Sequence, residues 1–168
     1  MRGIVILLGV MASSAGADIT VSFVEGAPKD RFVVENTGAC DLANFDVDLR
    51  LDTSAAGLIF DTSSSGAGVE VFQPLEVVAG REFLGSFDGP TDGDNRFIMP
   101  FTTLPAGARF AFTIDVDDTQ TAGPSGQIIV RGGEIEGAQV VVSYAGAQST
   151  GVFTNRAVAR VKMDACQG

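Results

Sequence analysis

The sequence predicts an all-β fold, an antiparallel sandwich of two sheets, and two observations carry this prediction. Apolar and polar residues alternate in several stretches, most clearly in 45–52 (FDVDLRLD) and 110–117 (FAFTIDVD). A period of two gives a strand one buried face and one exposed face. Glycine and proline interrupt these stretches, as in 26–28 (GAP) and 105–107 (PAG), which is typical of turns between short strands. No stretch shows the sustained apolar spacing of an amphipathic helix.

The expected strands follow one another along the chain after the first 17 residues. They cover 19–23, 31–35, 45–52, 57–61, 69–72, 75–78, 97–101, 110–117, 127–131, 139–144 and 157–163. Most of the 12 phenylalanines are expected to fill a core rather than to line a groove, because they fall on core-facing positions such as Phe23, Phe45, Phe110 and Phe112. A chain of 168 residues suits one domain of ordinary size, which we place at 18–168.

Residues 1–17 have the features of a secretory signal peptide. Arg2 supplies the positive charge, 4–12 is apolar, and Ala15-Gly16-Ala17 fits the small-residue cleavage pattern. We therefore expect cleavage between Ala17 and Asp18 and a secreted protein, located in the periplasm, outside the cell or on its surface. A buried N-terminal strand is the alternative. The apolar stretch is too short to cross a bilayer as a helix, and no later stretch approaches that length.

The chain has two cysteines, Cys40 and Cys166. An even pair in an exported protein predicts a disulfide, and two free thiols are the alternative. A bridge between distant strands suits two stacked sheets, so among sandwiches we expect an immunoglobulin-like (Ig-like) one.

The composition excludes several classes of function. With no histidine, the chain cannot form Ser-His-Asp or Cys-His catalytic sites or histidine-ligated zinc sites. The formal charge is −10; without residues 1–17, ten basic and 21 acidic residues remain, which gives −11. Such a charge argues against nucleic acid and anionic lipid as partners and is compatible with binding cations.

Two groups of acidic residues are candidates for a calcium site. Asp115, Asp117 and Asp118 end a predicted strand, whereas Asp88, Asp92 and Asp94 lie in a tight segment rich in glycine. Ca²⁺ takes six to eight oxygen ligands, which two loops at one end of a sandwich could supply together. Glu134 could complete the site if its loop lies beside Asp117. The alternative is that these residues form Asx turns and carry solvated charge.

A second pair of carboxylates, Glu134 and Glu136, shares one face of its segment. Paired carboxylates are the catalytic groups of glycosidases. That activity needs an aromatic platform for the sugar, however, and the chain has no tryptophan and only one tyrosine, Tyr144. We therefore predict that the protein is not an enzyme.

Several segments resemble a known family. They are 18–32 (DITVSFVEGAPKDRF), 35–38 (ENTG), 54–61 (SAAGLIFD), 66–74 (GAGVEVFQP) and 112–119 (FTIDVDDT). Together they resemble the secreted proteobacterial aggregation factor core proteins over most of the chain. The resemblance implies adhesion at the cell surface and assigns no site. Residues 35–38 and 104–110 (LPAGARF) are also similar to Ig-like modules of bacterial surface proteins.

These observations together predict a secreted, non-catalytic β-sandwich module for surface adhesion or aggregation, stabilised by calcium. Its partner would be another surface protein or a glycan, and its oligomeric state is left open. Two alternatives stay open as well. One is a carboxylate-based or metal-dependent hydrolase acting on a small or saccharide substrate, and the other is a periplasmic structural protein without a specific ligand.

Overall fold

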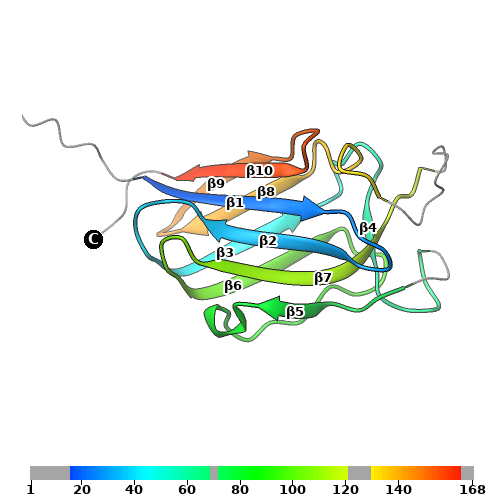
Figure 1. Cartoon of the computed structure of the whole chain (residues 1–168), viewed down its shortest axis with the longest axis horizontal. Helices are drawn as coiled ribbons and strands as arrows, with labels where there is room; N and C mark the ends of the chain where they lie inside the picture. Colours follow the sequence, from blue (N-terminus) through cyan, green and yellow to red (C-terminus); the bar gives the residue numbers. More distant parts are fainter. Residues whose placement is uncertain (1–15, 69–71, 121–129, 164–168) are drawn as a thin grey trace, which may run out of the picture.

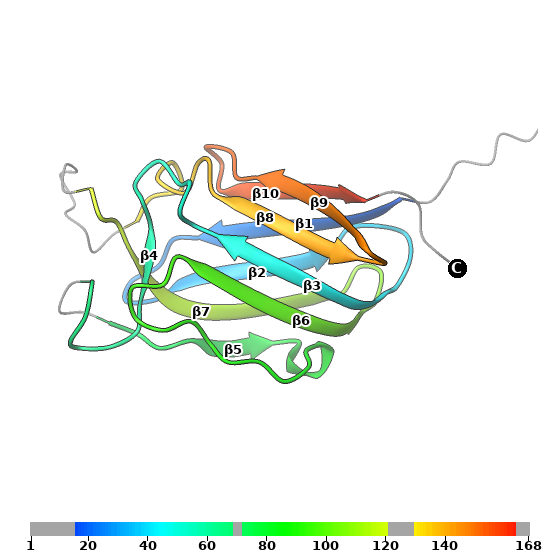
Figure 2. The ribbon, with the colours of Figure 1, turned by 180° about the vertical axis from the view of Figure 1, so that it is seen from behind.

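The computed structural model describes residues 16–68, 72–120 and 130–163, which form two stacked antiparallel sheets (Figures 1 and 2). The prediction of an all-β, two-sheet sandwich is thereby confirmed, and the Ig-like assignment stays a prediction. The strands of the described residues are β1 (Ala17–Val24), β2 (Asp30–Asn36), β3 (Leu42–Arg50), β4 (Ile59–Asp61), β5 (Glu76–Ala79), β6 (Arg96–Leu104), β7 (Arg109–Asp117), β8 (Gln139–Tyr144), β9 (Ala147–Val152) and β10 (Val158–Met163).

The six-stranded sheet has the order β10-β1-β2-β7-β4, and β5 pairs with β7 beside β4. The four-stranded sheet has the order β6-β3-β8-β9. The last strands of the two sheets, β9 and β10, run side by side in both views of the ribbon (Figures 1 and 2). At Gly151 of β9 the two backbones come so close that a Cβ would lie 2.5 Å from the carbonyl oxygen of Arg160.

The hydrophobic core lies between the two sheets and follows the predicted alternation. In β7, Phe110, Phe112, Ile114 and Val116 are fully buried in this core, and the next residues along the strand face the other way. Aromatic rings join neighbouring strands and the two sheets, with Phe32 stacked on Phe112 at 5.1 Å between ring centres. Val47, Leu49 and Leu51 are buried as the 45–52 pattern predicts.

Some predicted elements differ from those observed. The strand β9 was not predicted, because its sequence AQSTGV contains few large apolar residues. It forms because it completes the hairpin with β8, where Gln139 pairs with Val152 and Tyr144 pairs with Ala147. Residues 69–71 and 127–129 of two predicted strands lie outside the described residues. The described helical structure is the short 3₁₀ turn η1 (Arg81–Phe83), and no helix of the described residues has the length and apolar character needed to span a membrane.

Both ends of the domain lie on neighbouring strands. Ala17, the first residue of β1, is fully buried and pairs with Met163, the last residue of β10. Residues 1–15 of the predicted signal peptide lie outside the described residues, and so does Cys166 of the predicted disulfide. Cys40 is half-buried against the core.

Candidate cation site

The candidate site lies on the outer face of the six-stranded sheet, where the short strand β4 pairs with the end of β7. Asp61 is directly opposite Asp115 in this antiparallel ladder, and Ile59 is opposite Asp117. Residues opposite each other and two apart along a strand share a face, so the three aspartates point to the same side of the sheet. That side faces away from the core, which Ile114 and Val116 enter.

The three carboxylates are both close together and buried. Asp61, Asp115 and Asp117 each offer an oxygen such that these atoms all lie within 4.8 Å of one another. Their exposed fractions are 0, 5 and 1%. Outward-facing aspartates of a sheet are normally solvated, so their burial here requires a cover.

The cover is the loop 62–68, which follows β4, and Asp92 holds this loop in place. The Asp92 carboxylate accepts hydrogen bonds from the backbone N–H groups of Thr62 (2.9 Å), Ser63 (3.0 Å) and Ala67 (2.9 Å). Gly68 then packs directly against the aspartates. A Cβ at this position would collide with the Asp61 carboxylate and would lie 2.6 Å from Oδ2 of Asp117.

Burial and mutual repulsion raise the pKa values of the site. Burial, followed by the neighbouring carboxylates of Asp92 and Asp117, raises the pKa of Asp61 to about 7. Burial and the charge of Asp117 likewise raise the pKa of Asp115 to about 7. Asp30, at the start of β2, also has its pKa raised to about 7, chiefly by burial. Three acidic groups at this end of the sandwich therefore resist ionisation in the absence of a cation.

The hydrogen bonding of Asp61 is incomplete. In the described part of the chain, neither of its carboxylate oxygens receives a hydrogen bond from an N–H or hydroxyl group; their neighbours are other carboxylates, and Oδ2 of Asp115 also lacks a donor. A buried polar group without a partner costs roughly 1–3 kcal/mol, and a charged group costs more. A cation in contact with these oxygens would remove this cost, because it supplies the missing partner and neutralises the repulsion.

The donor atoms restrict the identity of such a cation. The cluster contains carboxylate oxygens and no nitrogen or sulfur ligand, a donor set that suits Ca²⁺, Mg²⁺ or Mn²⁺ rather than Zn²⁺. Ca²⁺ binds oxygens at roughly 2.3–2.6 Å, so two ligands of one Ca²⁺ ion are at most about 5 Å apart. The three carboxylates are therefore close enough to share one Ca²⁺ ion.

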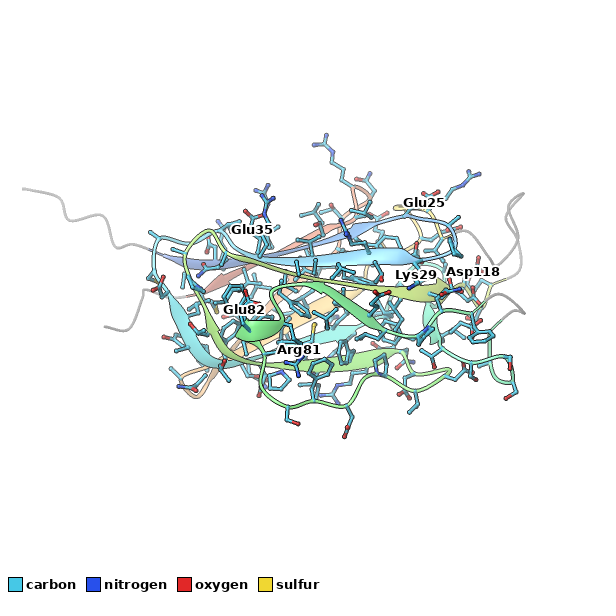
Figure 3. The ribbon with its side chains drawn as sticks, turned by 60° about the horizontal axis from the view of Figure 1, so that its bottom comes forward. Glu25, Lys29, Glu35, Arg81, Glu82 and Asp118 are labelled. Atoms are coloured by element: carbon cyan, nitrogen blue, oxygen red, sulfur yellow. The ribbon has the colours of Figure 1, made fainter. Side chains whose placement is uncertain are left out.

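The structure unites some of the predicted ligands and separates others. Asp115 and Asp117 belong to the cluster, and Asp92 adjoins it as the residue that holds the loop. Asp118, which follows the last residue of β7, is not part of the cluster; it is 4% exposed, and its pKa is raised by burial and by the charge of Glu134. Figure 3 shows Asp118 at the end of the sandwich that also carries Glu25 and Lys29.

The other predicted ligands have local roles. Glu134 accepts a hydrogen bond from the backbone N–H of Arg131, and Asp94 accepts two from the N–H and hydroxyl of Thr91 (both 2.7 Å). Asp88 is exposed. For Asp94, the alternative interpretation as a turn-forming residue describes the observed contacts.

Sequence analysis missed Asp61, which completes the cluster. The predicted strand 57–61 contains a usable signal, because the alternation that buries Leu58 and Phe60 places Ile59 and Asp61 on the other face. What the sequence lacks is any indication that this strand pairs with β7.

Comparison with known protein families, with curated proteins and with solved structures finds no match for this chain. The function proposed below therefore depends on the chemistry of the chain's own residues.

Proposed function

We propose that this chain is an exported, non-catalytic β-sandwich module that binds Ca²⁺ through Asp61, Asp115 and Asp117. The observation that carries the proposal is the state of Asp61. Its carboxylate is fully buried, faces the carboxylate of Asp115 across a strand pair, and receives no hydrogen bond from an N–H or hydroxyl group of the described residues. A buried charge of this kind is found paired or bound to a metal.

The bound ion would have a structural role. It would connect β4 and β7, and through Gly68 it would fix the loop 62–68 against the sheet. Without the ion, three acidic side chains repel one another beneath that loop. Calcium would thus act as a cross-link between segments that are distant in the sequence.

Burial of the carboxylates favours a module over a hydrolase. An ion that activates water for a substrate needs an open coordination position that the substrate can reach. Here the three ligands are at most 5% exposed and lie under a loop. The paired glutamates do not favour the glycosidase alternative, because the carboxylate of Glu134 accepts a backbone hydrogen bond within its own turn and is thus already engaged locally.

Export and adhesion are parts of the proposal that rest on the sequence. The signal-like residues 1–17 support secretion, and the expected disulfide between Cys40 and Cys166 fits an oxidising compartment. The resemblance to aggregation factor core proteins supports a surface protein or a glycan as partner.

Thermal unfolding in EDTA and in Ca²⁺ tests the cation site. At a Ca²⁺ concentration about 100 times Kd, binding adds about 2.7 kcal/mol to the free energy of unfolding. For a domain of this size, that corresponds to a rise in Tm of roughly 5–10 °C. Mg²⁺ and NaCl at matched ionic strength are controls, because screening alone stabilises a chain of charge −10.

The variant Asp61→Asn gives the test a distinctive outcome. It should abolish the Ca²⁺-dependent rise and should raise Tm in EDTA, because it removes one of two facing buried charges. Asp46→Asn is the matched control, since Asp46 is an exposed aspartate of β3. Equal Tm values in Ca²⁺ and in the NaCl control would refute the cation site.

A further inference from the structure

A second feature lies at the seam between the two sheets, around the turn that joins β9 to β10. Both views of the ribbon place this turn at the same end of the sandwich as β4 (Figures 1 and 2). A surface hollow of about 560 Å³ opens here, which we call the β9–β10 hollow. It is lined by Val152, Thr154, Asn155, Arg156, Val158 and Arg160.

The hollow carries positive charge in a protein that is otherwise acidic. Lys29, Arg50, Arg96 and Arg109 are all engaged in ion pairs with carboxylates. Arg156 and Arg160, by contrast, are exposed and belong to none of the ion pairs found in the described part of the chain. Two guanidinium groups that form no ion pair with the described carboxylates therefore line one hollow.

Arg160 also borders a second surface, which contains acidic residues. A shallow surface across β1 and β2 contains Asp18 and Glu35 together with Arg160 and Lys162. Glu35 already pairs with Arg109 at 3.1 Å, and Asp18 lies opposite Lys162 in the β1–β10 ladder. The hollow itself is lined by no acidic side chain among the described residues, and Arg156 lines the hollow but not the second surface.

The outer edge of β9 is open to a partner, because β9 is the terminal strand of its sheet and has one edge without a strand partner among the described residues. The corresponding edge of β10 is covered, since the N–H of Thr154 donates to the carbonyl oxygen of Val158 (3.1 Å) and Gly151 packs against the carbonyl group of Arg160. Val152, at the end of β9, is 51% exposed and adds an aliphatic surface beside the two arginines. An extended chain bearing carboxylates and aliphatic side chains would match these groups, since unpaired strand edges recognise extended peptides.

We propose that the β9–β10 hollow binds an acidic peptide segment in an extended conformation. Carboxylates of the segment would pair with the guanidinium groups of Arg156 and Arg160, which suit bidentate contacts with carboxylates. An aliphatic side chain would pack against Val152. This proposal does not depend on the cation site.

A peptide fits the hollow better than a glycan does. Sugar binding commonly uses aromatic stacking, and the chain has no tryptophan. Its one tyrosine, Tyr144, pairs with Ala147 at the far end of the β8–β9 hairpin from Val152. The hollow itself is lined by no aromatic side chain among the described residues.

Fluorescence anisotropy can test the proposal with a labelled decapeptide of alternating glutamate and valine. A peptide with glutamine in place of glutamate reports the contribution of charge, and an oligomer of alginate, a polyuronate, represents acidic glycans. We expect saturable binding of the glutamate peptide, at least tenfold weaker binding of the glutamine peptide, and no competition by the alginate oligomer. The affinity should fall as the NaCl concentration rises.

Variants locate the binding to the hollow. Arg156→Glu and Arg160→Glu should each weaken binding at least tenfold, and the milder Arg156→Gln and Arg160→Gln should weaken it in the same direction. Arg81→Glu is the matched control, because Arg81 is an exposed arginine of η1, which adjoins β6 through the Leu84–Phe101 bridge and does not line the hollow. It should bind within twofold of the parent, and so should Asp61→Asn in EDTA.

Three results would overturn the proposal. These are equal binding of the glutamate and glutamine peptides, unchanged binding by both Arg156→Glu and Arg160→Glu, and binding of alginate but not of the peptide. The last result would assign the hollow to a glycan instead.

Discussion

Asp61 of β4 lies directly opposite Asp115 of β7, and both carboxylates are buried on the same face of the six-stranded sheet. Like charges opposite each other on neighbouring strands destabilise a sheet even when they are exposed. Burial strengthens the repulsion because less water screens it. The pair is therefore more stable when a proton or a cation is bound between the two carboxylates.

Without an added cation, the free energy of unfolding should fall as the pH rises from about 4 to about 7. The pKa of Asp61 and of Asp115 is raised from 3.8 to about 7, chiefly by burial and then by neighbouring carboxylates. In this range the folded protein keeps protons that the unfolded chain has released. Each such proton lowers the free energy of unfolding by up to about 1.4 kcal/mol per pH unit.

Urea unfolding in chelator-treated buffers between pH 4.5 and 7.5 measures this slope. The Asp61→Asn variant should show a shallower fall, and saturating Ca²⁺ should restore stability at pH 7. A free energy of unfolding that rises from pH 4.5 to 7 in the metal-free protein would contradict the prediction.

Gly68→Ala should damage the cation site specifically. The new Cβ would collide with the Asp61 carboxylate, and the loop 62–68 would have to move away from the sheet. We expect a loss of stability of about 1–3 kcal/mol, as for other overpacked positions, and at least tenfold weaker Ca²⁺ binding by calorimetry. Gly133→Ala is the control, because a Cβ there meets no heavy atom within 4 Å. Similar Ca²⁺ affinities for the two variants would show that the loop does not form the site.

Asp48 is the centre of an ion-pair network on the outer face of the four-stranded sheet. It accepts hydrogen bonds from Arg50 (2.7 Å) and from two nitrogens of Arg96 (both 2.9 Å). Burial opposes ionisation of Asp48, but the hydrogen bonds from Arg96 and Arg50 outweigh it and lower its pKa. Because both arginines are partly exposed, Asp48→Ala should cost only about 1–2 kcal/mol in urea unfolding.

The contribution of Asp48 should also depend on pH. A lowered pKa means that its stabilisation is present above the unfolded value of 3.8 and is lost as the pH falls below it. The parent and Asp48→Ala should therefore converge in stability at acidic pH. Asp46→Asn, on the same strand but exposed, should leave the free energy of unfolding within about 0.5 kcal/mol of the parent.

Non-reducing peptide mapping should find Cys40 joined to Cys166. The backbone N–H groups of Thr37 and Gly38 donate to the carbonyl oxygen of Asp18 (2.8 and 3.2 Å), and Asp18 pairs with Lys162. Four residues then lead from Lys162 to Cys166, a reach of at most about 14 Å. Closing so long a loop is worth up to about 4–5 kcal/mol, so Cys166→Ser should lower Tm. Two free thiols in the secreted, unreduced protein would disprove the bridge.

The fold class could be predicted from the sequence because its signal is local. Alternation in 45–52 and 110–117 fixes which side chains enter a core, whatever the strands pair with. The polar strand β9 has no such signal, since pairing with β8 rather than its own composition makes it a strand.

The candidate site could be predicted only in part for the same reason. Asp115 and Asp117 are two apart on one strand, so the sequence places them on one face. Asp118 follows the end of β7 and is not part of the cluster, so the structure separates it from the other two predicted ligands. The carboxylate of Asp92 accepts hydrogen bonds from backbone N–H groups of the loop 62–68. No sequence pattern predicts these contacts.

The sequence by itself determined that this chain forms strands and which face of each strand is buried. It also determined that any ligands for a cation would be carboxylates. The tertiary structure alone decided that Asp61 faces Asp115, that a loop covers both, and that Arg156 and Arg160 share a hollow. Periodicity acts between neighbours along the chain, whereas strand pairing and sheet stacking join segments that are far apart in it. The chemistry of both proposed sites arises from those distant contacts.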